Sequence, residues 1–292
     1  MPTRIPRLAL AFLVLAAGCA HMTQTAEAPP KAPAPAGERV ERIAIASPVK
    51  PKVTSLGEAF SSAILIGNSF FYYNNSLHGH LGRLVNASDP KVGPLRATSV
   101  TISGSGIDWH NVDAYFSQPG MAAYSFDAKN NVNFNKLDKK YDVAVIMDCS
   151  QCPIHPQLKP IFHEFTKKNA EIVRKHRAKP VFFMSWAYED VPAMTAQLAE
   201  QYTIAGNAND ALVIPAGLAF AKALYKRPAL SLYVEDKRHP SLAGTYLAAC
   251  TVFASLYGRT PEGNKYTAGL DPSLAAFLQG VAWETVREYY GS

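Results

Sequence analysis

The chain has 292 residues, of which 48% are hydrophobic and 18% charged, and its formal net charge is +6 at pH 7. This balance excludes an intrinsically disordered chain and a protein built mainly of membrane-spanning segments. No run of Lys and Arg is interleaved with aromatic residues, so the sequence also argues against a nucleic acid as the partner.

The N-terminus has the form of a bacterial export signal. Arg4 and Arg7 precede an apolar run at residues 8–17, which is too short to remain in a bilayer as a spanning helix. The run leads into Ala-Ala-Gly-Cys, which resembles a bacterial lipobox whose usual leucine is displaced by one position, to Leu15. We therefore predict a lipoprotein signal peptide over residues 1–18, with an ordinary secretory signal as the alternative.

Cys19, at the end of this motif, is the predicted site of lipidation. The segment that follows is rich in Ala, Pro and Thr, and such a composition buries too little apolar surface to fold. We interpret residues 19–60 as an extended tether and lead-in. Acyl chains on Cys19 would hold the protein to a membrane, whereas an unlipidated chain would be secreted. Ala20 stands where inner-membrane lipoproteins carry Asp, so the resemblance favours the outer membrane of the cell envelope, facing the periplasm.

The rest of the chain, residues 61–292, alternates short apolar runs with longer amphipathic segments, which indicates one α/β domain. Most of the runs are rich in Val, Ile or Phe, as expected of strands that are buried on both faces. The predicted strands cover residues 63–66, 98–102, 143–147, 180–184 and 211–214.

The segments between and after these runs repeat apolar residues at helical spacing. The predicted helices lie around residues 161–173 and at residues 195–205, 218–225, 242–257 and 273–289. Strands that alternate with helices predict a flavodoxin-like three-layer α/β/α sandwich with a central parallel sheet of about five strands. Ligands of such sheets bind beyond the carboxyl ends of the strands, so the residues just after each strand are the candidates for a functional site.

Four motifs occupy positions of this kind. They are Gly-Asn-Ser-Phe at residues 67–70, Ser-Gly-Ser-Gly at 103–106, Asp-Cys-Ser-Gln-Cys-Pro at 148–153 and Asp-Lys-Arg-His-Pro-Ser at 236–241. Each is common when it stands alone: Gly-x-Ser is usually a turn, and Asp-x-x-His before a helix is often a helix start. In this order, however, they resemble the four blocks of the SGNH (GDSL-like) hydrolase superfamily. The resemblance extends from about residue 63 to the C-terminus and points to a little-characterised bacterial branch.

The resemblance implies a catalytic triad of Ser69, His239 and Asp236. A serine hydroxyl is a weak nucleophile until a base takes its proton, and His239 is the candidate base. A carboxylate must hold the imidazole tautomer and stabilise the cation that forms, and Asp236 lies only three residues away.

An ester hydrolase also needs donors for the developing oxyanion. By resemblance, these are the backbone N–H groups of Ser69 and Gly104 and a side-chain amide from the third block. That block contains no Asn here. Gln151 is the nearest amide, and Asn68 is the alternative third donor.

Other residues near the strand ends have two interpretations each. Trp186, Tyr188 and His110 are candidates for lining the substrate cleft, and core packing is the alternative for all three. Cys149 and Cys152 could form a redox pair or a local disulfide that shapes the loop, and the latter fits an oxidising compartment. Two cysteines are an incomplete zinc site, so we expect no metal.

The sequence therefore predicts a serine esterase that hydrolyses a carboxylic ester through an acyl-serine intermediate, without a metal or cofactor. An envelope location suggests O-acetylated glycans as substrates. Two alternatives remain at this point: an O-acyltransferase that uses the same residues, and a binding lipoprotein that has kept the fold without the chemistry.

Lipidation can be tested by metabolic labelling with a palmitate analogue. We expect the wild-type protein to be labelled and the Cys19→Ala variant not to be, because the thiol that carries the lipid is missing. Equal labelling of the two proteins would leave only a plain signal peptide.

Overall fold

The computed structural model describes residues 46–121 and 124–292. The predicted signal peptide, Cys19 and most of the predicted tether lie outside these residues. The chain divides into two units, residues 1–34 and residues 35–292, and every described residue belongs to the second.

The five predicted strands are all present and form one parallel sheet. They are β1 (Ser62–Gly67), β2 (Arg96–Thr101), β5 (Val143–Ile146), β6 (Lys179–Phe183) and β7 (Leu212–Ile214). Their order across the sheet is β2-β1-β5-β6-β7, and each neighbouring pair is parallel. This is the flavodoxin-like strand order, so the predicted fold class is confirmed.

Alternate residues of the central strands enter two separate hydrophobic cores, as the two-residue period of a strand requires. In β1, Ala63 and Leu65 face one core, and Ile64 and Ile66 face the other. The strands therefore read as continuous apolar runs because helices cover both faces. The edge strand β2 is only half-buried, which agrees with its content of Thr and Ser.

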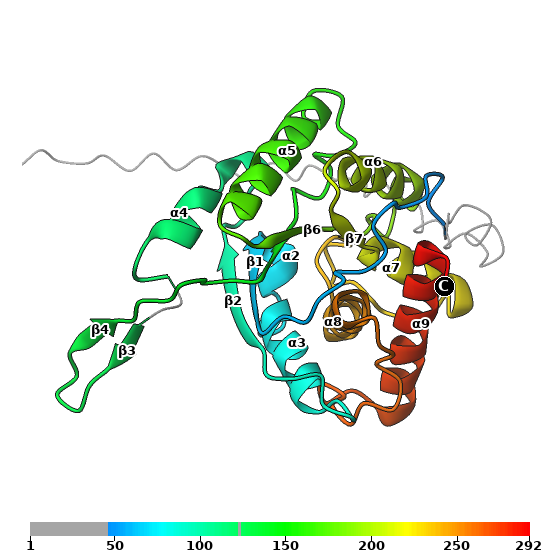
Figure 1. Ribbon diagram of the computed structural model, residues 1–292. Coiled ribbons are helices and arrows are strands. Elements are labelled where there is room, and N and C mark those ends of the chain that lie inside the picture. The colour runs from blue at the N-terminus through cyan, green and yellow to red at the C-terminus, as the bar shows by residue number, and fades with distance from the viewer. Residues whose placement is uncertain (1–45, 122–123) are drawn as a thin grey trace, which may run out of the picture. The chain divides into compact units, whose positions relative to one another are not determined.

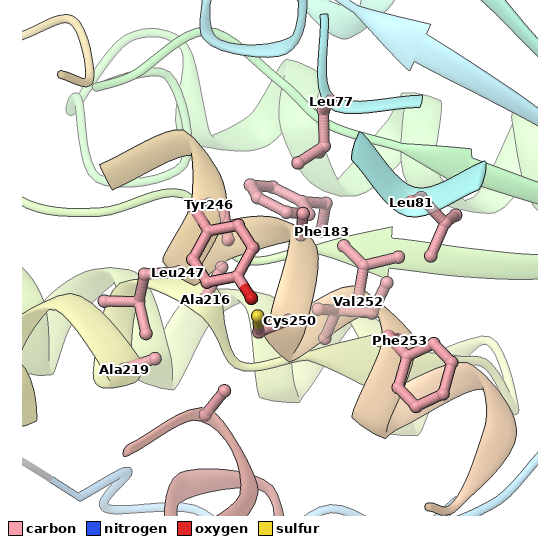
Figure 2. Close-up of a cluster of buried hydrophobic side chains, with 14 of the residues drawn as sticks. Leu77, Leu81, Phe183, Ala216, Ala219, Tyr246, Leu247, Cys250, Val252 and Phe253 are labelled. Atoms are coloured by element: carbon pink, nitrogen blue, oxygen red, sulfur yellow. The ribbon is translucent and has the colours of Figure 1, made fainter. Parts of the chain in front are cut away.

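Helices form the two outer layers (Figure 1). The first core packs β1 and its neighbours against α3 (Leu77–Asn86), α7 (Ala216–Lys226), α8 (Leu242–Tyr257) and α9 (Pro272–Tyr290). Figure 2 shows the part of this core in which side chains of α3, β6, α7 and α8 meet.

The second core lies on the opposite face of the sheet. It packs against α4 (Val112–Ser117), α5 (Lys159–Lys175) and α6 (Met194–Ala208). All five predicted helices are thus present, with ends that differ from the prediction by up to three residues. None of the helices in the described part of the chain is long and apolar enough to cross a membrane.

The packed part of the domain begins before Ser61, the residue at which we placed its start. Within residues 46–60, the backbone N–H of Lys52 donates to Asn207 Oδ1 at 2.7 Å, and Leu56 and Phe60 are buried. The last part of the predicted lead-in therefore lies against the domain.

The end of β1 packs closely against Met147, the residue that follows β5. A Cβ atom at Gly67 would lie 2.6 Å from Met147 Cγ and 2.9 Å from the ring of Phe71, so no larger residue fits there without a shift. The chain turns immediately after Gly67, and Ser69 begins the short helix α2 (Ser69–Tyr72).

Candidate active site

Three side chains form a hydrogen-bonded chain at the carboxyl edge of the sheet. Ser69 Oγ lies 2.8 Å from His239 Nε2, although the two residues are 170 positions apart. On the other side of the ring, His239 Nδ1 lies 2.5 Å from Asp236 Oδ2. A carboxylate can only accept, so Nδ1 carries the proton and Nε2 is free to accept from the serine hydroxyl. The structure therefore brings together the three residues that the sequence indicated.

The loop that carries His239 is folded around the Asp236 carboxylate. Asp236 Oδ1 accepts from the backbone N–H groups of Arg238 at 2.8 Å and of His239 at 2.9 Å. Lys237 takes the left-handed conformation that this tight turn needs. Burial alone would raise the pKa of Asp236, but the hydrogen bonds from the side chain and backbone of His239 outweigh it, so the pKa is lowered. The carboxylate thus stays charged and can stabilise a protonated imidazole.

Aromatic side chains hold the imidazole ring from two directions. The ring of Tyr73 stacks on His239 at 4.3 Å between centroids, and the ring of Phe70 meets its edge at 5.5 Å. Both residues follow Ser69 closely in the chain, so the segment that carries the serine also positions the base.

Arg238 connects the histidine loop to the loop after β6. Its guanidinium lies over the ring of Tyr188 at 3.9 Å from the centroid and forms an ion pair with Asp190. Its backbone oxygen accepts from Trp186 Nε1 at 3.0 Å. Arg238 could not be singled out from the sequence, because its role depends on partners some fifty residues away.

Trp186 is a core residue rather than a cleft residue. It is buried, and its ring is stacked between Phe70 at 4.6 Å and Phe220 at 4.3 Å. This outcome matches the alternative of core packing, and Trp186 supports the site indirectly, through the ring of Phe70 and the backbone oxygen of Arg238.

Asn68 is fully used in holding the site together. Its side-chain nitrogen donates to the backbone oxygen of Ser105 at 3.1 Å and of Asp148 at 3.2 Å, and its Oδ1 accepts from Phe70 N. An amide has only two N–H groups, so none is left for an oxyanion. The expectation that Asn68 could be the third oxyanion donor is therefore wrong.

Two backbone N–H groups are available at the edge where the serine lies. Ser69 is the first residue of α2, so its N–H has no acceptor within the helix. Gly104 lies in a tight turn with φ of +69°, where Ser105 N donates to Ile102 O. The Gly104 N–H makes no hydrogen bond within the described ranges. Both groups are free to bind an anionic oxygen.

His110 supports the Gly104 loop and does not line a cleft. It is buried, and its Nε2 lies 3.0 Å from Ser105 Oγ while its Nδ1 lies 3.1 Å from the hydroxyl of Tyr115. Burial lowers the pKa of His110, which keeps the ring neutral and suited to these two contacts. The expectation that His110 contributes to the substrate cleft is wrong.

The third block presents a hydroxyl pair in place of an amide. Ser150 Oγ lies 2.7 Å from the hydroxyl of Tyr188, and both groups are partly exposed. The side chain of Gln151 is exposed and makes no hydrogen bond with any other described residue. Sequence position alone could not distinguish two neighbouring residues of which one is partly buried beside Tyr188 and the other is exposed.

Cys149 and Cys152 are joined in a disulfide, which closes the loop that carries Ser150. Their sulfurs and a carboxylate oxygen of Asp148 lie within 4.8 Å of one another. Because thiolates are needed for metal binding and these sulfurs are bonded to each other, the cluster does not fit a metal.

Asp148 is a buried residue that immediately precedes this loop in the chain. It is 2% exposed, and its Oδ1 accepts from the backbone N–H groups of Ile107 and Cys149, each at 2.7 Å. Burial is the largest influence, and it raises the pKa of Asp148 to about 6 in spite of these hydrogen bonds. Asp148 therefore connects the loops after β2 and β5 and titrates near neutral pH.

No family model and no curated protein matches the chain. Solved structures do match it. A DUF4886 family protein from Bacteroides uniformis has a TM-score of 0.51 and 19% identity, over 77% of this chain and 93% of its own. A putative SGNH hydrolase from Slackia heliotrinireducens has a TM-score of 0.49 and 18% identity, over 67% and 98%.

A catalytic mutant of an acetylxylan esterase from Geobacillus stearothermophilus has a TM-score of 0.48 and 14% identity, over 70% of this chain and 95% of its own. The structural neighbours include SGNH hydrolase proteins. At such low identity the likeness concerns the fold alone, and the site must be judged on its own geometry.

The raised pKa of Asp148 predicts a pH dependence of stability. The pKa of an Asp carboxyl in an unfolded chain is about 3.9. The folded protein therefore binds the proton of Asp148 more tightly than the unfolded chain does. The contribution of the group to stability is fully present below about pH 4 and is lost as the pH rises through about 6, by up to about 3 kcal/mol.

The Asp148→Asn variant keeps the acceptor for Ile107 and Cys149 but does not titrate. Urea unfolding of both proteins across this pH range should show the wild type losing stability relative to the variant as the pH rises. If the unfolding free energies of the two proteins change equally with pH, burial does not raise the pKa of Asp148.

Proposed function

We propose that this protein is a serine hydrolase that cleaves carboxylic esters through an acyl-serine intermediate. The observation that carries the proposal is the continuous chain from Ser69 Oγ through the imidazole of His239 to the Asp236 carboxylate, with free backbone donors beside the serine. A turn serine on a non-catalytic fold needs none of these partners.

The geometry supports a two-step reaction. In the first step, Ser69 Oγ attacks the ester carbonyl carbon while His239 Nε2 takes the hydroxyl proton, and the Asp236 carboxylate stabilises the imidazolium. The carbonyl oxygen becomes an oxyanion, which accepts from the N–H groups of Ser69 and Gly104. The tetrahedral intermediate collapses when the C–O bond to the alcohol breaks and His239 returns its proton to the departing oxygen.

The second step regenerates the enzyme. Water attacks the acyl-serine carbonyl, His239 accepts a proton from this water, and the same two N–H groups hold the second oxyanion. The bond to Ser69 Oγ then breaks, His239 protonates the serine, and the carboxylic acid leaves. No group beyond the side chains named and water is needed to balance either step.

We propose Ser150 as the third oxyanion donor. It occupies the third block, where the superfamily pattern has an amide, and the Cys149–Cys152 disulfide constrains its loop. The Tyr188 hydroxyl can accept or donate in the pair, so Ser150 can turn its own O–H toward a new charge. Arg238 holds the Tyr188 ring next to the histidine loop, which brings the pair to the same edge as the triad.

An O-acylated glycan is the proposed substrate class. The side chains of Asp236 and His239 are 43% and 25% exposed, so the triad lies at the surface, where it can reach a small acyl group on a bulky alcohol. The proposed lipid anchor at Cys19 and an envelope location would place the enzyme next to such glycans. An acetyl group is the simplest acyl group that meets this description.

The triad can be tested with an active-site probe. Wild-type protein should react with a fluorophosphonate and hydrolyse p-nitrophenyl acetate, because His239 activates the Ser69 hydroxyl. Ser69→Ala should abolish both activities, His239→Ala should nearly abolish them, and Asp236→Asn should lower turnover by about 10⁴ because the imidazole tautomer is no longer held.

Ser273→Ala, at the start of α9, is the control and should behave as the wild type. Circular dichroism establishes that each variant is folded. Folded wild-type protein that neither reacts with the probe nor hydrolyses any short-chain ester would refute the proposal, and residual activity in Ser69→Ala would show that another group is the nucleophile.

The third donor can be tested by comparing neighbouring residues. Ser150→Ala should lower kcat by about 10² with little change in KM, because an oxyanion contact forms only in the transition state. Gln151→Ala should leave both constants unchanged, and Tyr188→Phe should cost less than Ser150→Ala because it leaves the serine hydroxyl in place. Equal effects of the Ser150 and Gln151 changes would rule out this assignment.

A further inference from the structure

One element of the domain has no role in the proposed reaction. Strands β3 (Tyr124–Phe126) and β4 (Val132–Phe134) form an antiparallel hairpin between α4 and β5 that the sequence analysis did not foresee. In Figure 1 this hairpin projects away from the central sheet and its helices. An isolated two-stranded hairpin is marginally stable in water, so its persistence calls for something that covers it.

One face of the hairpin is made of large apolar side chains. The register places Tyr124 opposite Phe134 and Phe126 opposite Val132, so all four project from the same face. Their exposed fractions range from 49% for Val132 to 64% for Phe126. The opposite face carries the polar pair Ser125 and Asn133. We call the four apolar residues the hairpin face; such a concentration of exposed rings marks a binding surface.

The chemistry of the hairpin face narrows the choice of partner. The Tyr124 hydroxyl is its one side-chain hydrogen-bonding group, whereas recognition of a sugar needs several polar groups beside the rings. The hairpin face therefore suits a partner that offers few hydrogen-bonding groups. Tyr and Phe side chains favour the boundary between lipid headgroups and acyl chains for this reason.

The charge around the hairpin face is positive. Lys129 in the turn and Lys136 just after β4 have no acidic partner in the described part of the chain. Asp127, the acid in the turn, stays ionised, because hydrogen bonds from Asn131 and from the backbone N–H of Lys129 lower its pKa. Residues 124–136 thus carry two lysines against one aspartate, and this positive excess complements an anionic surface.

We propose that the hairpin face docks on an anionic lipid surface, with its rings in the headgroup region and Lys129 and Lys136 on lipid phosphates. The hairpin leads into the amino end of β5, whereas Ser69 follows the carboxyl end of β1. Docking therefore takes place at the opposite edge of the sheet from the triad and leaves that site uncovered.

The proposal can be tested by depth-dependent quenching in vesicles. Full-length protein carrying Phe126→Trp is mixed with phosphatidylglycerol-rich vesicles whose acyl chains are brominated, and wild-type emission is subtracted. The matched control is Tyr225→Trp, at an exposed site on α7. Any N-terminal anchor holds both variants at the same vesicles, so a difference between them reports the hairpin.

We expect quenching of the added emission in Phe126→Trp and none in Tyr225→Trp. Phosphatidylcholine vesicles, or the double change Lys129→Glu and Lys136→Glu, should remove most of this quenching. Equal quenching of the added emission in the two tryptophan variants would overturn the proposal. Quenching that is equally strong on neutral vesicles would overturn the role of the lysines. Because no reaction at Ser69 is measured, the result is independent of the proposed hydrolase activity.

Discussion

The side-chain amide of Asn68 is the contact on which the rest of the site depends. Its two N–H groups bind the backbone oxygens of Ser105 and Asp148, which lie on the loops after two different strands. One buried residue thereby sets the separation of the loops that carry the nucleophile, the Gly104 N–H and the third block. Because buried donors that lose their acceptors are costly, the three loops are held as one unit.

A second set of contacts positions the base against that unit. The histidine loop folds on the Asp236 carboxylate, Tyr73 stacks on the ring, and Arg238 ties the loop to Tyr188 and Asp190. The residues that make these contacts are close in sequence to His239 or lie near the surface, whereas the Asn68 amide is buried. The rigid half of the site carries the nucleophile and oxyanion donors, and the half nearer solvent carries the group that must exchange protons. Preorganisation of this kind lowers the cost of reaching the transition state.

Much of the fold could be predicted from the sequence because the central strands are covered on both faces and read as plain apolar runs. The triad could be predicted because Ser69 follows the first strand and Asp-x-x-His precedes a helix, which brings both to one edge. The roles of Asn68 and His110 could not, since each depends on which backbone or side-chain partner lies beside it in space. The choice between Ser150 and Gln151 depends on burial and on the contact of Ser150 with Tyr188. The hairpin strands are too short, at three residues each, to give a periodic signal.

The central claim is that Ser69 itself becomes acylated during turnover. It is tested most directly by quenching the protein with acid while it hydrolyses p-nitrophenyl acetate and mapping modified peptides by mass spectrometry. The account predicts an acetyl group on the peptide that contains Ser69. Turnover of the ester with the acetyl group on another residue, and none on the Ser69 peptide, would contradict it.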